Sequence, residues 1–186
     1  MNNREVRKAA EAKVREGRSR QQVFDALKVE GTGLSDEALA NIVRYTPSLA
    51  LQRAYRTPHS VLLVLLWVTA VAKSLNGVVM ALEQGWHRLP WVLILPSITI
   101  LLGVAIARRR TRAYHTIAVL SAIGLLRLLL RKEWIADPFI LIDIALAIAM
   151  AALAWYLFSK MASNYEAMDA PEGTKRILFP AEPATA

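Results

Sequence analysis

The sequence predicts an all-α integral membrane protein, built as an up-down-up-down four-helix bundle with a small N-terminal cytosolic helical head. Four long apolar stretches occupy the second part of the chain, short connections separate them, and most charged residues there gather in clusters between them. Of the 186 residues, 55% are hydrophobic and 20% are charged, whereas an average soluble domain has roughly 25% charged residues. These features exclude an ordinary soluble enzyme and a disordered chain, and the lack of cysteine excludes a disulfide scaffold.

Each of the four apolar stretches is long enough to cross a bilayer. A bilayer core needs about 20 mostly apolar helical residues, within a range of roughly 17 to 25. A soluble bundle of buried helices is the alternative, but a domain of this size has too little polar surface to cover four such helices. We expect the first stretch to act as its own insertion signal, because it begins too far along the chain for a cleaved signal peptide. The predicted spans are residues 60–82, 89–107, 113–130 and 138–158.

The short connections and the basic residues predict the topology. Short connections join antiparallel neighbours, so successive spans cross in opposite directions. An excess of basic residues marks the cytoplasmic side of a membrane protein. We therefore expect a multi-pass protein of the inner membrane with both termini in the cytoplasm, and an anionic inner leaflet as its lipid partner. The predicted inner side has seven basic residues and the outer side three: Arg53, Arg56, Arg108, Arg109, Arg110, Arg112 and Lys160 against Arg88, Arg131 and Lys132.

Prolines mark where three of the predicted spans begin, and Pro90 is the one at the start of the second span. Pro58 and Pro138 each follow a residue suited to an N-cap, and proline at the first helical position costs no backbone hydrogen bond. Pro96 lies inside the second span instead, where it removes one backbone hydrogen bond and predicts a kink. We expect this kink to be structural rather than a gating hinge.

Residues 1–57 form the predicted cytosolic head, which carries a net charge of +4. Ser19 and Gln22 have the spacing of a capping box, and Ser35 is placed to cap the third helix. The head helices near residues 20–30 and 35–45 form a helical hairpin of the kind that some DNA-binding proteins use. The second of these two helices has only Arg44 as a basic residue, so we expect no nucleic-acid partner. A basic head beside an anionic leaflet favours docking at the membrane surface or on a partner protein. The expected head helices are near residues 3–16, 20–30, 35–45 and 48–56.

Residues 159–186 form the predicted tail, a partly disordered cytosolic segment. Its proline and glycine residues argue against a helix that continues beyond about Met168. Residues 175–179 are a short segment with an apolar end that lies between these prolines. This segment either docks on the head or on a partner, or it belongs to a tail without fixed contacts.

Three ionisable residues fall inside the predicted spans: Lys73, Arg127 and Asp143. Charged side chains are costly in a bilayer, so each one raises a functional hypothesis. Arg127 and Asp143 are equally far along the chain from the middle of their shared connection, which places them at matching depth. We expect these two to form a structural clamp, with Lys73 near enough to reach the same carboxylate. An ion or proton pathway is one alternative, and separate snorkelling of the side chains toward the interface is the other.

The remaining chemistry of the sequence is sparse. With no cysteine and only His59, His87 and His115, we expect no catalytic residues, no cofactor and no metal site. The sequence therefore favours a non-enzymatic accessory or interaction protein, such as a scaffold or complex subunit, with a protein partner that binds the head and the tail. The alternatives are a small transporter or channel that uses the three intramembrane charges, and a membrane-tethered regulator. A homo-oligomer is compatible with each of these functions.

Overall fold

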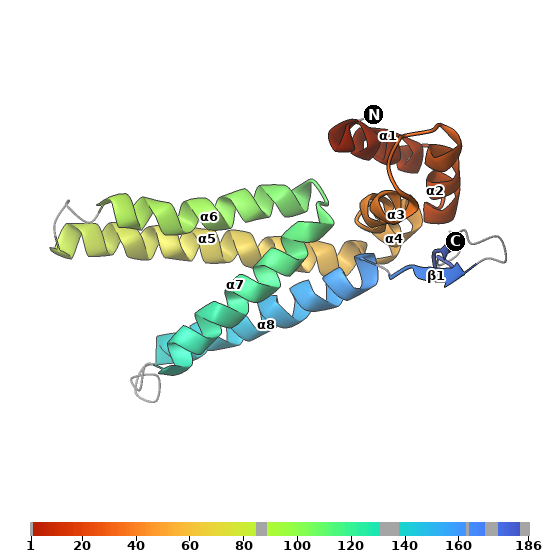
Figure 1. Cartoon of the computed structure of the whole chain (residues 1–186). Coiled ribbons are helices and arrows are strands. Elements are labelled where there is room, and N and C mark those ends of the chain that lie inside the picture. Colours follow the sequence, from red (N-terminus) through yellow and green to blue (C-terminus); the bar gives the residue numbers. More distant parts are fainter. Residues whose placement is uncertain (1, 85–88, 131–137, 163, 170–174, 183–186) are drawn as a thin grey trace. The chain divides into compact units, whose positions relative to one another are not determined.

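The computed structural model describes residues 2–84, 89–130, 138–162, 164–169 and 175–182, and in these the chain is mostly helical (Figure 1). The sequence predicts an all-α fold, but the structure also contains a two-stranded sheet near the C-terminal end. The helices are α1 (Asn3–Arg15), α2 (Arg20–Val29), α3 (Asp36–Arg44), α4 (Leu49–Ala54), α5 (Arg56–Gln84), α6 (Leu89–Ala107), α7 (Thr111–Leu130) and α8 (Pro138–Met161), and the strands are β1 (Glu166–Asp169) and β2 (Lys175–Leu178).

The chain divides into two compact units. The first, which we call the head unit, combines Met1–Arg56 with Phe158–Ala186. The second, which we call the helical unit, is Thr57–Leu157. The head unit thus combines residues from both ends of the chain, and the sequence leaves open whether the tail docks on the head.

Local signals account for the helices of the head unit. The Ser19 hydroxyl accepts a hydrogen bond from the Gln22 amide at 3.3 Å, and the Gln22 side chain accepts one from the Ser19 amide at 2.9 Å. This reciprocal pair is the predicted capping box. The Ser35 hydroxyl likewise accepts from the Ala38 amide at 3.3 Å, which caps α3 as predicted. The predicted short N-terminal helices are therefore confirmed.

The head unit has an apolar core of its own. Buried residues recur every three or four positions in its helices, as Val6, Ala10 and Val14 do in α1, which is the repeat of an amphipathic helix. Aromatic rings extend the core, because Phe179 lies 6.0 Å from Phe24 between ring centroids. The buried core residues are Val6, Ala10, Val14, Val23, Phe24, Leu27, Leu39, Ala40, Val43 and Ile177.

Part of the segment predicted to be a partly disordered tail forms an antiparallel hairpin. β1 pairs with β2 so that Glu166 lies opposite Leu178 and Ala167 opposite Ile177. Ile177 is only 2% exposed and belongs to the head core. A two-stranded hairpin is marginal by itself, but packing against helices stabilises it. The segment around Ile177 therefore docks on the head, which is one of the outcomes that the sequence leaves open.

Among the residues that the structure describes, three helices are long and apolar enough to cross a membrane: Arg56–Glu83, Thr111–Leu130 and Ile140–Met161. α6 covers the residues of the remaining predicted span and continues through Pro96. Among the described residues, the part of α6 from Pro96 to Ala107 is an apolar helix that is shorter than a membrane span. Three of the predicted spans thus correspond to helices of spanning length and composition.

The start of α5 differs from its prediction. The helix begins at Arg56, so Pro58 lies within the first turn rather than at the first helical position. Proline is tolerated there because the first amides of a helix have no intrahelical acceptor. The N-cap that the sequence predicts at Thr57 is therefore not formed.

The helices of the helical unit run in alternate directions along the chain (Figure 1). On α5 the buried residues His59, Leu62, Leu66 and Ala70 recur every three or four positions and form one stripe. On α7 the buried residues are confined to the first turns, and none of its described residues beyond Ala118 is buried. Within the helical unit, fully buried residues thus occur near the start of α5 and of α7, and also in the second half of α8, where Ala154 and Leu157 are 0% exposed.

Candidate functional site

The three charges predicted inside the spans lie on different helices. Lys73 is in α5, Arg127 in α7 and Asp143 in α8, and all three are exposed. No ion pair joins any two of these residues, each of which belongs to the described part of the chain. The structure does not bring the predicted clamp together, so the pairing of Arg127 with Asp143 stays a prediction.

A buried polar pair joins α5 to α7 near the start of both helices. The Nδ1 atom of His59 and the hydroxyl group of Tyr114 share a hydrogen bond of 2.7 Å. Their rings lie 6.1 Å apart at an interplanar angle of 70°, in an edge-to-face arrangement. Polar contacts of this kind hold apolar helices together in a bilayer, where the hydrophobic effect does not drive helix association. The sequence shows His59 as one of three histidines and does not predict this pair.

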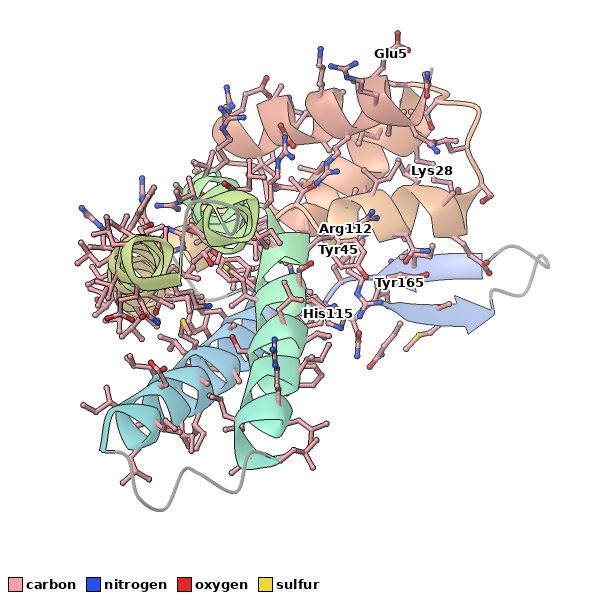
Figure 2. The ribbon with its side chains drawn as sticks, turned by 90° about the vertical axis from the view of Figure 1, so that its left-hand side faces the viewer. Glu5, Lys28, Tyr45, Arg112, His115 and Tyr165 are labelled. Carbon is pink, nitrogen blue, oxygen red and sulfur yellow. The ribbon has the colours of Figure 1, made fainter. Side chains whose placement is uncertain are left out.

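Two further contacts join α8 to its neighbours. The Thr69 hydroxyl donates to the carbonyl oxygen of Leu65 at 2.7 Å and lies 3.7 Å from the Sδ atom of Met150. The rings of His115 and Trp155 lie 6.5 Å apart, and Figure 2 shows His115 on α7. Together with His59 and Tyr114, these residues link α5, α7 and α8.

An arginine-rich turn connects α6 to α7. Arg108, Arg110 and Arg112 are exposed, and Arg109 between them is partly buried. Arg109 has a left-handed backbone with a φ of 54°, and its amide donates to the carbonyl oxygen of Ile106 at 2.6 Å. This backbone geometry ends α6 and turns the chain toward α7. The turn places four cationic residues together at one end of the helical unit.

The head unit contains a buried guanidinium group, that of Arg20 at the start of α2. Arg20 is 2% exposed, and its Nε atom donates to the carbonyl oxygen of Thr46 at 3.3 Å. Its Nη2 atom donates to the carbonyl oxygen of Met161, the last residue of α8. The Oε1 atom of Glu182 lies 3.7 Å from Nε and forms an ion pair with it. Arg20 therefore ties α2 to the ends of α3 and α8 and to the segment after β2.

Burial changes the protonation equilibrium of Arg20. Desolvation lowers the pKa of Arg20 from its ordinary value to about 10, and the nearby carboxylate of Glu182 opposes this by raising it. The guanidinium group is thus charged at neutral pH, and its carbonyl and carboxylate partners offset the cost of its desolvation. The Oε1 atom of Glu182 is buried without a hydrogen bond, so its contact with Arg20 is electrostatic.

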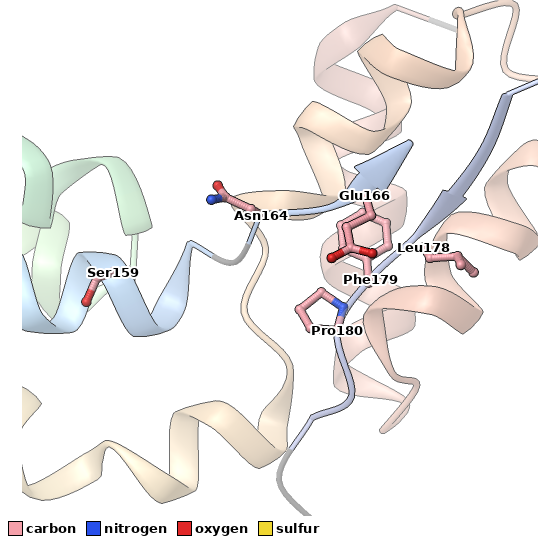
Figure 3. A pocket seen from close by; sticks show the side chains of 6 residues that line it. All are labelled: Ser159, Asn164, Glu166, Leu178, Phe179 and Pro180. Carbon is pink, nitrogen blue, oxygen red and sulfur yellow. The ribbon is translucent and has the colours of Figure 1, made fainter. Parts of the chain in front are cut away.

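An open hollow of about 420 Å³ lies beside the hairpin (Figure 3). Glu166 and Leu178 lie opposite each other in the sheet register and both line the hollow. Asn164 is held at its rim because its Oδ1 atom accepts a hydrogen bond from Arg44 at 2.6 Å. A carboxylate beside apolar side chains suits a basic side chain better than an anion. The lining residues are Ser159, Asn164, Glu166, Leu178, Phe179 and Pro180.

Within the residues that the structure describes, no group of three or more His, Asp or Glu side chains is placed to hold a metal ion. No protein-family model matches the chain, and it has no match among the curated proteins or the solved structures. Its function is therefore inferred from the contacts described above.

Proposed function

We propose that this chain is a multi-pass protein of the inner membrane and a non-enzymatic accessory protein, whose head unit docks a partner protein at the cytoplasmic surface. The observation that carries the proposal is the way in which the head unit is assembled. This unit has its own apolar core, combines residues from both ends of the chain, and is a separate unit from the long apolar helices. A compact unit of this kind, tethered to a membrane at two points, offers a fixed polar surface to a partner.

The shared head unit favours an even number of membrane crossings. Residues before α5 and residues after α8 pack into one unit, so they lie on the same side of the membrane. Three crossings would place them on opposite sides, whereas four return the chain to the side where it began. α6 has 19 residues, within the length that a span requires, and supplies the fourth crossing. These observations support an up-down-up-down bundle.

The arginine-rich turn favours the cytoplasm as the compartment of the head unit. With four crossings, the turn between α6 and α7 lies on the same side as the start of α5. Arg108, Arg110 and Arg112 are exposed there, and such residues mark the cytoplasmic side. They also face the anionic inner leaflet, where each basic residue contributes about 1 kcal/mol to attraction toward the surface.

Two other functions have weaker support. A small transporter or channel would use Lys73, Arg127 and Asp143, and no ion pair joins these three charges, all of which the structure describes. A membrane-tethered regulator would bind nucleic acid through α2 and α3, of which α3 carries two acidic residues in its first turn. A homo-oligomer fits either function as well as the proposed one.

Purification of the full chain in mild detergent tests the docking role. We expect a stoichiometric protein partner with the natural sequence. The substitution Val43→Asp places a charge in the head core, where Val43 is 0% exposed, and should release the partner while the chain stays in the membrane. Val29→Asp is the matched control, because Val29 is 88% exposed and its loss leaves the core intact.

Three results would contradict the proposal. The first is purification of the natural protein without a stoichiometric partner. The second is a Val43→Asp protein that retains the partner as well as the control does, and the third is a catalytic activity in the purified protein.

A further inference from the structure

The two outer edges of the β1–β2 sheet are in different states. The edge of β2 is covered by the side chain of Gln21 from α2. The Nε2 atom of Gln21 donates to the carbonyl oxygen of Ile177 at 3.4 Å, and the Phe179 amide donates to its Oε1 atom at 3.0 Å. One amide side chain thus bonds to this edge as a neighbouring strand would.

The register then determines which groups of β1 face outward. In an antiparallel pair, successive residues point their N–H and C=O groups alternately toward the partner strand and away from it. Because Ile177 faces Gln21, its cross-strand neighbour Ala167 also faces away from the sheet. Ala167 is exposed, and in the described part of the chain it makes no backbone hydrogen bond outside the sheet. The N–H and C=O groups of Ala167 are therefore an open edge.

The open edge lacks several of the devices by which proteins protect an edge strand, which include proline, lysine and a bulge. Short length and charged side chains are further devices, and β1 has both, because it is four residues long and contains Glu166 and Asp169. β1 contains neither proline nor lysine, and its register with β2 is continuous over all four residue pairs. An edge of this kind accepts an extended peptide by strand addition, in which backbone hydrogen bonds give affinity and side chains give specificity.

We propose that the edge of β1 binds an extended basic segment of a partner protein as a third strand. This inference rests on the proposed docking role of the head unit and names its surface and its ligand. Glu166 is exposed and forms no ion pair, although it is in the described part of the chain. Its carboxylate lines the hollow with Leu178, so a lysine or arginine side chain of the incoming strand can enter beside it (Figure 3).

Charge favours a basic partner segment over a second copy of this chain. If two copies paired through β1 about Ala167, each Glu166 would lie opposite the other copy's Met168 and diagonal to its Glu166. Two carboxylates on the same face of such a sheet repel each other. A basic segment places an opposite charge at this position.

A labelled peptide of seven residues, with lysine and valine in alternation, is the probe. Fluorescence anisotropy measures its binding to the full chain in nanodiscs of uncharged lipid, so that the bilayer itself does not attract it. We expect binding about tenfold tighter than that of a peptide with glutamate in place of lysine. A lysine–valine peptide with methylated backbone amides on its pairing edge should lose binding by a similar factor, because it cannot donate to the edge.

A pair of variants at Ala167 separates strand addition from simple charge attraction. Ala167→Pro removes the outward N–H and is tolerated on an edge strand, whereas Ala167→Val keeps it. We expect the proline variant to bind the peptide about tenfold more weakly and the valine variant to bind normally. Hydrogen exchange at the Ala167 amide should slow when the peptide is added to the natural protein. Glu166→Lys should reverse the preference, so that the glutamate peptide binds better.

Equal binding by the proline and valine variants, or unchanged exchange at Ala167, would overturn the proposal. A dimer of the natural chain that Ala167→Pro converts to a monomer would also overturn it, because a second copy then occupies the edge. The proposed docking role of the head unit is tested separately from strand addition. If Ala167→Pro protein keeps a stoichiometric partner that Val43→Asp releases, the head unit docks its partner elsewhere.

Discussion

The head unit and the helical unit place their large apolar side chains in opposite environments. In the described part of the head unit, only Val29 and Met168 are large hydrophobic residues that are exposed. The helical unit exposes such residues on every helix, with Leu75 at 64%, Leu101 at 68% and Leu130 at 74%. A surface of this kind is a liability in water and is the normal surface of a protein in lipid. The comparison indicates that one chain folds against two different solvents.

The polar contacts between helices also differ between the two units, because they join charged groups in the head unit and neutral groups in the helical unit. In the head unit, ion pairs join successive helices, as Lys28 and Asp36 do at 2.6 Å across the turn between α2 and α3. In the helical unit, the contacts between helices described above join neutral groups, such as His59 and Tyr114. Charged pairs suit a unit surrounded by water, where their exposed atoms stay hydrated. Neutral hydrogen bonds suit a unit whose surroundings cannot hydrate a charge.

The largest expected effect is the loss of the buried guanidinium group. Arg20→Met should lower the free energy of unfolding of the head unit by about 3 kcal/mol, because two carbonyl groups and Glu182 lose their partner. Arg18→Met is the control, since the Arg18 side chain is 44% exposed and its pair with Glu16 contributes at most about 1 kcal/mol. Denaturant titration of the full chain measures both. Equal losses in the two variants would show that Arg20 is not a structural clamp.

A charged residue introduced at an exposed position should have different effects in the two units. Leu75→Asp in the helical unit should cost about 3 kcal/mol of membrane insertion, because the side chain faces lipid. Val29→Asp in the head unit should change stability by at most about 0.5 kcal/mol, because the side chain faces water. A membrane-insertion assay on both variants measures the first effect. Full insertion of the Leu75→Asp chain would mean that α5 is not surrounded by lipid.

Removal of the hydrogen bond between α5 and α7 should have a smaller effect. His59→Phe and Tyr114→Phe should each destabilise the helical unit by about 0.6 to 1.7 kcal/mol, the range for polar contacts between membrane helices. Unfolding of the protein in detergent gives these values. The double variant should cost less than the two single variants added together, since both remove the same bond. Strict additivity would show that the bond does not contribute to stability.

The smallest expected effect concerns the charges in the spans. The clamp predicted from sequence requires coupling between Arg127→Gln and Asp143→Asn, two residues that the structure describes without an ion pair between them. If the clamp forms, the double variant should cost less than the two single variants added together, by at least about 0.5 kcal/mol. A double-mutant cycle measures this coupling. Strict additivity would contradict the clamp, and loss of a transport activity at unchanged stability would favour the pathway.

Features of the fold that depend on neighbouring residues were predictable from the sequence. The capping box of Ser19 and Gln22 and the cap at Ser35 are local, so the head helices could be placed closely. The apolar spans are equally local, because length and composition define them. The hairpin was missed because its stability depends on the burial of Ile177 among helices that lie far away in sequence. A short segment between prolines gives no local sign of such packing.

The contacts of the candidate site were harder to predict for the same reason. Arg20 follows a capping serine on a helix, a position where a charged residue is usually exposed. Its partners Thr46 and Met161 are 26 and 141 residues away, so no spacing in the sequence signals its burial. His59 and Tyr114 are 55 residues apart and meet only when α5 packs on α7. The charges Arg127 and Asp143 were easy to identify, but their pairing depends on helix rotation, which the sequence does not determine.

Hydrogen exchange on the full chain with Ile177→Asp tests most directly whether both ends of the chain form one unit. Ile177 is 2% exposed in the head core, whereas Met168 is 52% exposed, so Met168→Asp is the matched control in the same hairpin. We predict that Ile177→Asp reduces the protection of amides in α1, α2 and α3 as well as in the hairpin, while the control leaves α1 to α3 protected. Loss of protection confined to β1 and β2 would contradict the account, because the head helices would then fold without the C-terminal segment.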